Sequence, residues 1–258
     1  MAANIKQPAE IVRMRRAGKV VADVLQIMVS NIELGMETRR LDEIAVIELK
    51  KLRASSSFKG YHGYPASVCV SINDEIVHGI PGDRRIKEGD LVSLDFGAVV
   101  DGLHGDGAIT VIAGSGNPLT RQLVDTTREA LLAGIAEALP GNHLGDISSA
   151  IQRYAESRGF SVVREYTGHG IGRAMHEEPL VPNFGYAGEG IELKPGMTFA
   201  LEPMLTTGDW HTKVGSDHWG VYTLDGSLAA HFEHTIAITG GAAEILTVPS
   251  DEAEKHAL

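Results

Sequence analysis

The sequence predicts an α+β fold built from two duplicated half-domains, with helices covering one face of a largely antiparallel sheet. First, residues 86–95 recur as residues 193–202, and each copy carries Lys, then Gly, four further residues, Leu and a carboxylate. Second, the tripeptide His-Gly-Ile at 78–80 recurs at 169–171, in the same order relative to the first repeat. Third, helical periodicity precedes strand-like patterns in each half. Recurrence of two motifs in one order indicates an internal repeat.

The composition indicates a cytoplasmic protein with one large domain or two small ones. The 258 residues carry 23 Lys and Arg against 34 Asp and Glu, and this charge of −11 argues against a direct nucleic-acid site. Cys69 is the one cysteine, which excludes an internal disulfide and suits a reducing compartment. No apolar run approaches the ~20 residues of a membrane span, and the first residues lack the apolar core of a secretory signal.

In the first half, a helix is predicted to begin at Pro8, where proline costs no hydrogen bond, and to continue to about Gly35. Thr38 is expected to cap a second helix. The glycine-rich, aromatic residues 60–65 should form a loop. Strands are predicted at 68–72, 76–78, 91–100 and 108–112, and the turn Asp101-Gly102 should join the last two as a hairpin.

The second half repeats this order of elements. A helix is predicted from Leu119 to Leu139, and Asp146 is expected to cap another that runs to Arg158, with Gly159 past its end. Strands are predicted at 160–163 and 197–202, a hairpin is possible around Asp225-Gly226, and 232–239 should close the sheet.

The hairpin brings two carboxylates together. If Asp101 and Gly102 are the turn residues, Gly97 pairs with Asp106, and Asp95 lies diagonally from Asp106 on the same face. Two carboxylates on a half-buried face repel each other and are tolerated when a cation lies between them. A solvated polar face is the alternative, but apolar Leu94 and Phe96 on either side of Asp95 indicate a buried strand.

Three further residues fit the same cation site. Glu202 is the repeat partner of Asp95, and Glu233 lies in a second apolar strand. His169 has glycines on both sides, which we expect to let the backbone approach a ligand closely. Each residue alone could be an ordinary surface or loop residue. Together, four carboxylates and one imidazole suit a pair of Mn, Fe, Co or Zn ions better than a structural zinc, which prefers thiolates.

These residues and the sequence motifs around them resemble those of the methionine aminopeptidases, and the resemblance extends from Pro8 to Thr247. The motifs are Gly60-Tyr61-His62-Gly63-Tyr64-Pro65, Cys69-Val70-Ser71-Ile72-Asn73, His78-Gly79-Ile80-Pro81, Gly168-His169-Gly170-Ile171-Gly172, Glu202-Pro203 and Glu233-His234-Thr235. The resemblance implies the pita-bread fold, as a single catalytic domain over 1–258 with pseudo-symmetric halves at about 8–114 and 117–247. The short separation of Glu202 and Glu233 fits type I, since type II enzymes carry an inserted subdomain there.

The resemblance also implies a reaction: removal of the N-terminal methionine when the second residue is small, by a water or hydroxide that bridges two divalent metals. Asp95 and Glu233 would bridge the metals, while Asp106, His169 and Glu202 complete the coordination. Glu202 would also accept and return the proton, His176 would donate to the scissile carbonyl, and His78 would contact the scissile amide nitrogen. Nascent polypeptide N-termini near the ribosome are the expected substrates of a monomeric enzyme.

A methionine side chain needs an apolar, soft pocket. The candidates for its walls are Phe58, Tyr61, Tyr64, Cys69 and Trp219. We expect Gly97, Gly170 and the two histidines to leave little room for a second residue, and Met1-Ala2 of this chain satisfies that rule.

Two positions differ from the usual family sequence, and a third lies at an expected cation site. Gly107 follows Asp106 where relatives often carry Thr, so a hydroxyl near the metals should be missing, and Phe232 replaces a frequent Tyr. Asn73 lies where relatives hold a structural monovalent cation. Two other functions remain open: an Xaa-Pro peptidase of the same fold, and a binding module that has lost catalysis.

Overall fold

The computed structural model describes residues 3–250, so Met1 and Ala2, which we discussed as a substrate sequence, lie outside the described residues. Four α-helices and a 3-10 turn are present in this part of the chain: α1 (Pro8–Ser30), α2 (Arg39–Lys51), η1 (Tyr61–Gly63), α3 (Pro118–Ala136) and α4 (Leu144–Glu156). The strands are β1 (Ser55–Ser56), β2 (Cys69–Ile72), β3 (Glu75–Val77), β4 (Leu91–Val100), β5 (Leu103–Ile112), β6 (Ser161–Val162), β7 (Gly168–Gly170), β8 (Glu177–Val181), β9 (Thr198–Leu201), β10 (Met204–Thr206), β11 (Thr212–Val214), β12 (Val221–Thr223), β13 (Ala229–His231), β14 (Glu233–Ala237) and β15 (Glu244–Ile245).

A nine-stranded sheet forms the centre of the molecule, with the order β1-β4-β5-β14-β9-β7-β8; β2 also pairs with β4, and β15 with β14. All its described pairings are antiparallel, as predicted. Strand β14 does not close the sheet at an edge but lies in its middle, where it joins β5 of the first half to β9 of the second. Two small sheets, β13-β10-β6 and β11-β12-β3, lie beside it.

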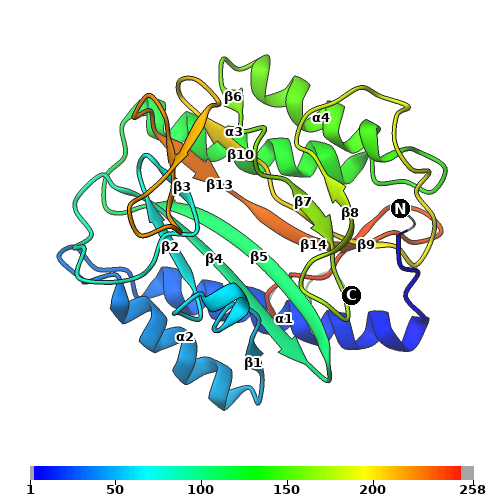
Figure 1. The fold of residues 1–258 in the computed structure, drawn as a ribbon, viewed down its shortest axis with the longest axis horizontal. Helices are drawn as coiled ribbons and strands as arrows, with labels where there is room; N and C mark the ends of the chain where they lie inside the picture. Colours follow the sequence, from blue (N-terminus) through cyan, green and yellow to red (C-terminus); the bar gives the residue numbers. More distant parts are fainter. Residues whose placement is uncertain (1–2, 251–258) are drawn as a thin grey trace.

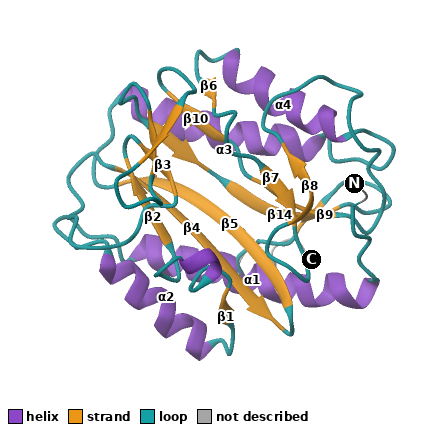
Figure 2. Ribbon diagram, viewed as in Figure 1, coloured by secondary structure: helices purple, strands orange, loops and turns teal. Residues whose placement is uncertain are grey.

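The helices form two pairs along the large sheet. Figure 1 shows α1 and α2 next to β4 and β5, and α3 and α4 on the other side of the molecule, with the strands between the pairs. Figure 2 shows that the loops gather around the ends of the strands. One apolar core joins α1 and α2 to β4, and another joins α3 and α4 to β9 and β14. Each half therefore has its own helix pair and core, as the repeat predicts.

The β4–β5 hairpin has the predicted register. Asp101 and Gly102 adopt φ values of 50° and 76°, which the two-residue hairpin turn requires, and Gly97 pairs with Asp106. Because side chains alternate along a strand, Leu94 and Phe96 enter the core with α1, while Asp95 points to the opposite face. The face of the sheet away from the helices therefore carries the carboxylates.

The face of β5 that touches α1 carries glycines. A Cβ at Gly105 would lie 2.7 Å from the amide nitrogen of Gly18, so helix and strand approach backbone to backbone. A Cβ at Gly107 would lie 3.1 Å from Val21 Cγ1, on the helix side of the strand. The expectation that Gly107 removes a hydroxyl near the metals is therefore wrong, because a side chain at this position points away from Asp106.

Two local expectations are also wrong, and another is confirmed only in part. Thr38 occupies the N-cap position of α2, as predicted, but its hydroxyl makes no cap hydrogen bond and instead accepts the Gly82 amide proton at 2.8 Å. Asp146 is the third residue of α4, where its carboxylate accepts the amide of His143, the true N-cap residue, at 2.6 Å. The turn Asp225-Gly226 is not a hairpin, since β12 pairs with β11 and β3 while β13 pairs with β10. Within residues 3–250, none of the helices has the length and apolar character needed to cross a bilayer.

Candidate metal centre and substrate pocket

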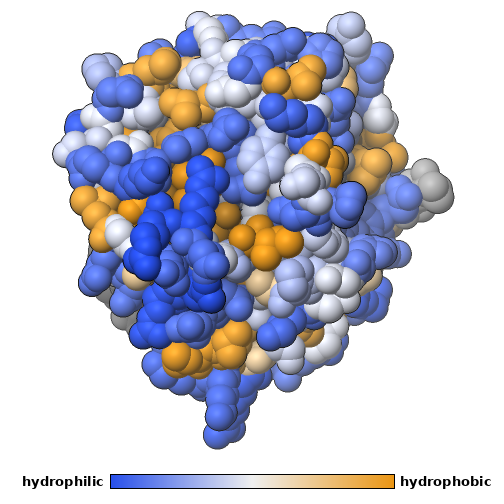
Figure 3. Space-filling model, turned by 60° about the vertical axis from the view of Figure 1, so that its left-hand side comes forward, coloured by the Kyte–Doolittle hydropathy of each residue, from blue (hydrophilic) through white to orange (hydrophobic). Residues whose placement is uncertain are grey.

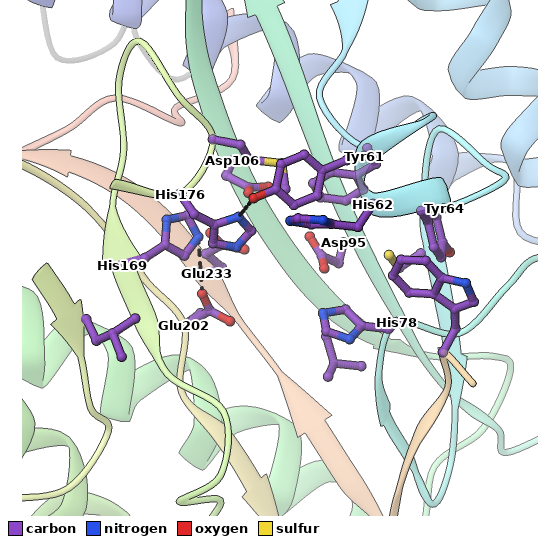
Figure 4. Close-up of a pocket in the computed structure, with 16 residues that line it drawn as sticks. Tyr61, His62, Tyr64, His78, Asp95, Asp106, His169, His176, Glu202 and Glu233 are labelled. Carbon is purple, nitrogen blue, oxygen red and sulfur yellow. Dashed lines mark hydrogen bonds and ion pairs between the residues drawn. The ribbon is translucent and has the colours of Figure 1, made fainter. Parts of the chain in front are cut away.

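A pocket of about 460 Å³ opens on the face of the sheet that the helices leave free. Its walls contain the predicted catalytic, metal-binding and pocket residues, which are Phe58, Tyr61, Tyr64, Cys69, His78, Asp95, Asp106, His169, His176, Glu202, Trp219 and Glu233. Four further residues line it that the sequence did not predict: His62, Val77, Met175 and Leu180. Figure 4 shows the carboxylates at its centre with imidazole rings around them. Figure 3 shows only separate apolar spots among hydrophilic residues on one outer face. The concave pocket is therefore the candidate site.

Strands from both halves supply the central polar groups. Asp95 comes from β4, Asp106 from β5, Glu233 from β14 and His169 from β7, and each is buried. Asp106, His169 and Glu233 place ligand atoms within 4.8 Å of one another, which is the spacing of groups around a metal ion. Glu202 follows β9 directly, and its Oε1 lies 3.5 Å from His169 Nε2. The pairing of β14 with both β5 and β9 brings these donors together.

The glycines beside His169 have a role in the packing of the sheet. A Cβ at Gly168 would overlap the carbonyl oxygen of Ala200, and one at Gly170 would lie 2.5 Å from that of Glu178. The glycines therefore let β7 fit between β8 and β9, and their expected close approach to a ligand stays a prediction. His169 Nδ1 lies 2.9 Å from the Gly170 carbonyl oxygen, which leaves Nε2 facing the carboxylates.

The carboxylates are electrostatically unfavourable without a cation. Burial raises the pKa of Asp95 to about 7, and burial together with the charge of Asp95 raises the pKa of Asp106 well above its usual range. Burial and the neighbouring carboxylates do the same for Glu202 and Glu233. Among the described residues, Asp95 Oδ1 and Glu233 Oε1 are buried and have no hydrogen-bond partner. These orphaned oxygens and the converging charges fit divalent metal ions.

The donor set favours particular metals. It contains carboxylate oxygens and one imidazole, whose pKa burial lowers to about 3 and which is therefore neutral and able to coordinate. Burial raises the pKa of the Cys69 thiol well above its usual value, so this sulfur stays protonated. A site of oxygens and one nitrogen suits Mn, Fe, Co or Zn in a catalytic role, and not a thiolate-based structural zinc.

An apolar compartment adjoins the carboxylates. Phe58, Tyr64 and Cys69 form a buried cluster with Met175, and Tyr61 and Trp219 pack against it. The Tyr64 hydroxyl donates to backbone carbonyls, with Gly79 O at 2.8 Å, so its ring is fixed in the wall. The Tyr64 and Trp219 rings meet edge to face with centroids 5.0 Å apart. Soft and aromatic surfaces of this kind accommodate an unbranched apolar side chain.

Two histidines lie on opposite sides of the carboxylates in Figure 4. His176 Nδ1 lies 2.8 Å from the Tyr61 hydroxyl oxygen, and its ring centroid lies 4.1 Å from that of His169. His78 adopts φ 63°, a left-handed conformation that residues with a side chain rarely adopt. Burial lowers the pKa of His78 to about 4, so it is neutral near pH 7. Strained backbone of this kind often occurs at functional sites.

Two histidines at or beside the pocket were not predicted from the sequence. His62 lines the pocket mouth, with its ring 4.4 Å from that of Tyr61. His231 is buried, and its Nε2 lies 3.9 Å from Glu202 Oε2. Within residues 3–250, neither of its ring nitrogens has a hydrogen-bond partner. The signal for His231 was its position two residues before Glu233, but its orientation depends on the β10–β13 pairing, which is not visible in the sequence.

The metal-free protein is expected to lose stability as the pH rises from ~7.5 to ~8.5. In this range histidines are largely neutral in the unfolded as well as in the folded state, whereas buried carboxyls with raised pKa in the folded state release protons that the unfolded chain has already lost. The free energy of unfolding should fall by up to about 1.4 kcal/mol per pH unit for each such carboxyl. Urea unfolding of chelator-treated protein measures this, and Asp95→Asn should flatten the dependence. A pH-independent stability would contradict the proposed burial of charge.

The comparisons with known proteins agree with this geometry. Residues 12–240 match metallopeptidase family M24. The chain is 48% identical over 242 residues to methionine aminopeptidase 1 of Bacillus subtilis, an alignment that covers 94% of this chain and 98% of that protein. The crystal structure of methionine aminopeptidase from Thermotoga maritima superposes with a TM-score of 0.94 at 48% identity, covering 95% of this chain and 99% of that one.

A more distant likeness concerns the fold alone. The prolidase of Pyrococcus furiosus superposes with a TM-score of 0.77 at 23% identity, over 95% of this chain and 66% of the prolidase. The shared architecture is the pita-bread fold that the repeat and the sequence motifs led us to expect. By sequence and structure together, the chain belongs to metallopeptidase family M24 and, within it, to the methionine aminopeptidases.

Proposed function

We propose that this protein removes the N-terminal methionine from polypeptides whose second residue is small. The observation that carries the proposal is the junction, in one pocket, of a five-residue donor set, four members of which are buried, with an apolar compartment. Asp95, Asp106, His169, Glu202 and Glu233 would hold two divalent ions. The bound ions would act as a Lewis acid and lower the pKa of a water molecule.

The remaining chemistry falls to side chains of the chain. Glu202 lies at the edge of the donor set, where its carboxylate can accept a proton from the attacking water and return it to the leaving amine. The contact of His176 Nδ1 with the Tyr61 hydroxyl fixes the ring and leaves Nε2 free to donate to the scissile carbonyl oxygen. His78, on the other side of the pocket, would contact the scissile amide nitrogen.

The methionine side chain would occupy the compartment of Phe58, Tyr61, Tyr64, Cys69 and Trp219. Thioether sulfur packs favourably against aromatic edges, which Tyr64 and Trp219 supply. The second residue of the substrate would then lie over the carboxylates between His78 and His176. A large side chain there would overpack the site.

Cleavage of short peptides tests this arrangement. Met-Ala-Ser, Met-Gly-Ser and Met-Ser-Ser are expected to be cleaved, and Met-Lys-Ser, Met-Leu-Ser and Met-Phe-Ser to be cleaved very poorly, by the steric argument. Measuring kcat/KM for each peptide checks the order, and Leu-Ala-Ser is the control for the first pocket. Comparable values for Met-Ala-Ser and Met-Lys-Ser would refute the steric argument. Faster cleavage of Gly-Pro than of Met-Gly peptides would favour an Xaa-Pro peptidase.

The wider setting is part of the same proposal. The substrates would be nascent chains near the ribosome, the enzyme would be a cytoplasmic monomer, and its two halves would act as a single catalytic domain. The native ions would be Fe, Mn, Co or Zn, which anaerobic titration of metal-free protein distinguishes. A monovalent cation would bind near Asn73, whose carbonyl oxygen accepts the Ala229 amide at 2.9 Å and keeps a free lone pair.

A further inference from the structure

We infer that Lys6 and Glu177 are positioning residues: their buried ion pair fixes the loop that carries His176, so the segment before α1 forms part of the active site. The inference rests on the role proposed above for His176. It concerns residues 171–176, which connect β7 to β8 and hold the histidine beside the metal centre.

The ion pair is unusually buried. Lys6 Nζ lies 2.7 Å from Glu177 Oε2, and the two side chains are only 1% and 6% exposed. Arg15 and Glu244, by contrast, form an ion pair at the surface, where their side chains are 47% and 33% exposed. Removing one partner of a buried pair leaves an uncompensated charge, which is far more damaging than breaking a surface pair.

Glu177 closes the loop through its second oxygen. Oε1 accepts the amide protons of Arg173 at 2.7 Å and Ala174 at 3.2 Å, and Oε2 accepts the Asn4 side-chain amide at 2.9 Å as well as the Lys6 ammonium. The middle of the loop and the segment before α1 are thus tied to one carboxylate. His176 precedes this carboxylate directly, so its backbone is fixed by the same contacts.

Lys6 lies in a slot between two glycines. Its amide donates to the Gly196 carbonyl at 2.7 Å, and a Cβ at Gly196 would lie 2.9 Å from the Lys6 carbonyl oxygen. A Cβ at Gly172 would overlap Lys6 Cε. Gly172 is the last residue of the His169 motif, and the metal centre does not explain it. Its small size is explained by the passage of the lysine side chain.

The contacts of His176 depend on this support. Its ring stacks on Tyr61 with centroids 5.3 Å apart and lies 4.1 Å from the His169 ring. A displacement of about 1 Å at a catalytic group can cost roughly 100-fold in rate. Loss of the Lys6 contact should therefore act on the rate through His176, while the metal ligands, four of which lie on strands and one directly after a strand, keep their places.

A double-mutant cycle tests the inference. Lys6→Met keeps the length of the side chain and removes its charge, and we expect kcat for Met-Ala-Ser to fall by about 10- to 100-fold. KM and the affinity for Mn²⁺, measured by calorimetry, should stay unchanged. In a His176→Ala background the same change should have no further effect on kcat, because the group through which Lys6 acts is already absent.

Arg15→Met is the matched control, since it breaks an exposed ion pair of α1, and its kcat should equal that of the wild type. If Lys6→Met does not fold, the pair Lys6→Met with Glu177→Met removes both charges, and it should fold and still show the lowered kcat. Multiplicative losses from Lys6→Met and His176→Ala, or normal kcat in Lys6→Met, would overturn the inference. Normal kcat in His176→Ala would instead refute the proposed role of His176.

Discussion

Asp106→Ala is expected to abolish peptidase activity and divalent-ion binding together. Asp106 is buried among the other donors, and its carboxylate lies with His169 and Glu233 at the spacing of metal ligands. The substitution removes one of the three side chains whose ligand atoms lie within 4.8 Å of one another. We expect the same outcome for Asp95→Ala and Glu233→Ala. Metal content after dialysis against Mn²⁺, together with kcat for Met-Ala-Ser, measures both effects.

Metal-free Asp106→Ala should at the same time be more stable than the metal-free wild type at pH ~8. Burial and the charge of Asp95 raise the pKa of Asp106, so the folded state favours the protonated carboxyl. As the pH rises and this proton is released, the folded wild type loses stability, whereas the alanine variant has no carboxyl to ionise. Asp125→Asn, at a solvent-exposed carboxylate, is the control and should change neither activity nor metal content. Near-normal turnover of Asp106→Ala at saturating metal would show that the site assignment is wrong.

His176→Ala is expected to retain its metal and to lose most of kcat, by roughly 10²–10³-fold, the usual effect of removing one donor to a developing oxyanion. His176 contacts the Tyr61 hydroxyl and stacks near His169, but it is not among the groups spaced for a metal ion. Metal content and kcat measured on the same preparation separate the two roles.

The control for His176 is His211→Ala. His211 is an exposed histidine that stacks on Trp210 and contacts Asp209, away from the pocket-lining residues. Its replacement should leave kcat unchanged. If His176→Ala lost metal to the same degree as the Asp106 variant, His176 would be a ligand and not a proton donor.

The sequence was sufficient to bring Asp95 and Asp106 together because that prediction depended on local rules. A two-residue turn fixes the register of a hairpin, so the positions of Asp101 and Gly102 were enough to pair Gly97 with Asp106. Alternation along β4 then placed Asp95 opposite the buried Leu94 and Phe96. The repeat related Glu202 to Asp95 without any knowledge of the sheet.

Contacts between distant segments could not be predicted in this way. Asp225-Gly226 has the same composition as the true hairpin turn, but the strands on either side find other partners. The glycines at 168 and 170 also accommodate the backbone of neighbouring strands, and Gly172 accommodates the Lys6 side chain, contacts that the local sequence did not indicate. In each case the deciding neighbour lies far away in the sequence, and a local pattern carries no information about it.

The central position of β14 sets the order in which the molecule can assemble. Glu233 pairs with Ala108, a contact that spans nearly half of the chain, and such long-range pairing forms slowly because loop closure precedes the gain in contacts. Until β14 inserts, β5 and β9 both present open edges, which can pair with other chains. Neither half alone holds the full set of donors. Tight metal binding should therefore appear only with this last pairing, so a metal-binding signal recorded during refolding would time the completion of the sheet.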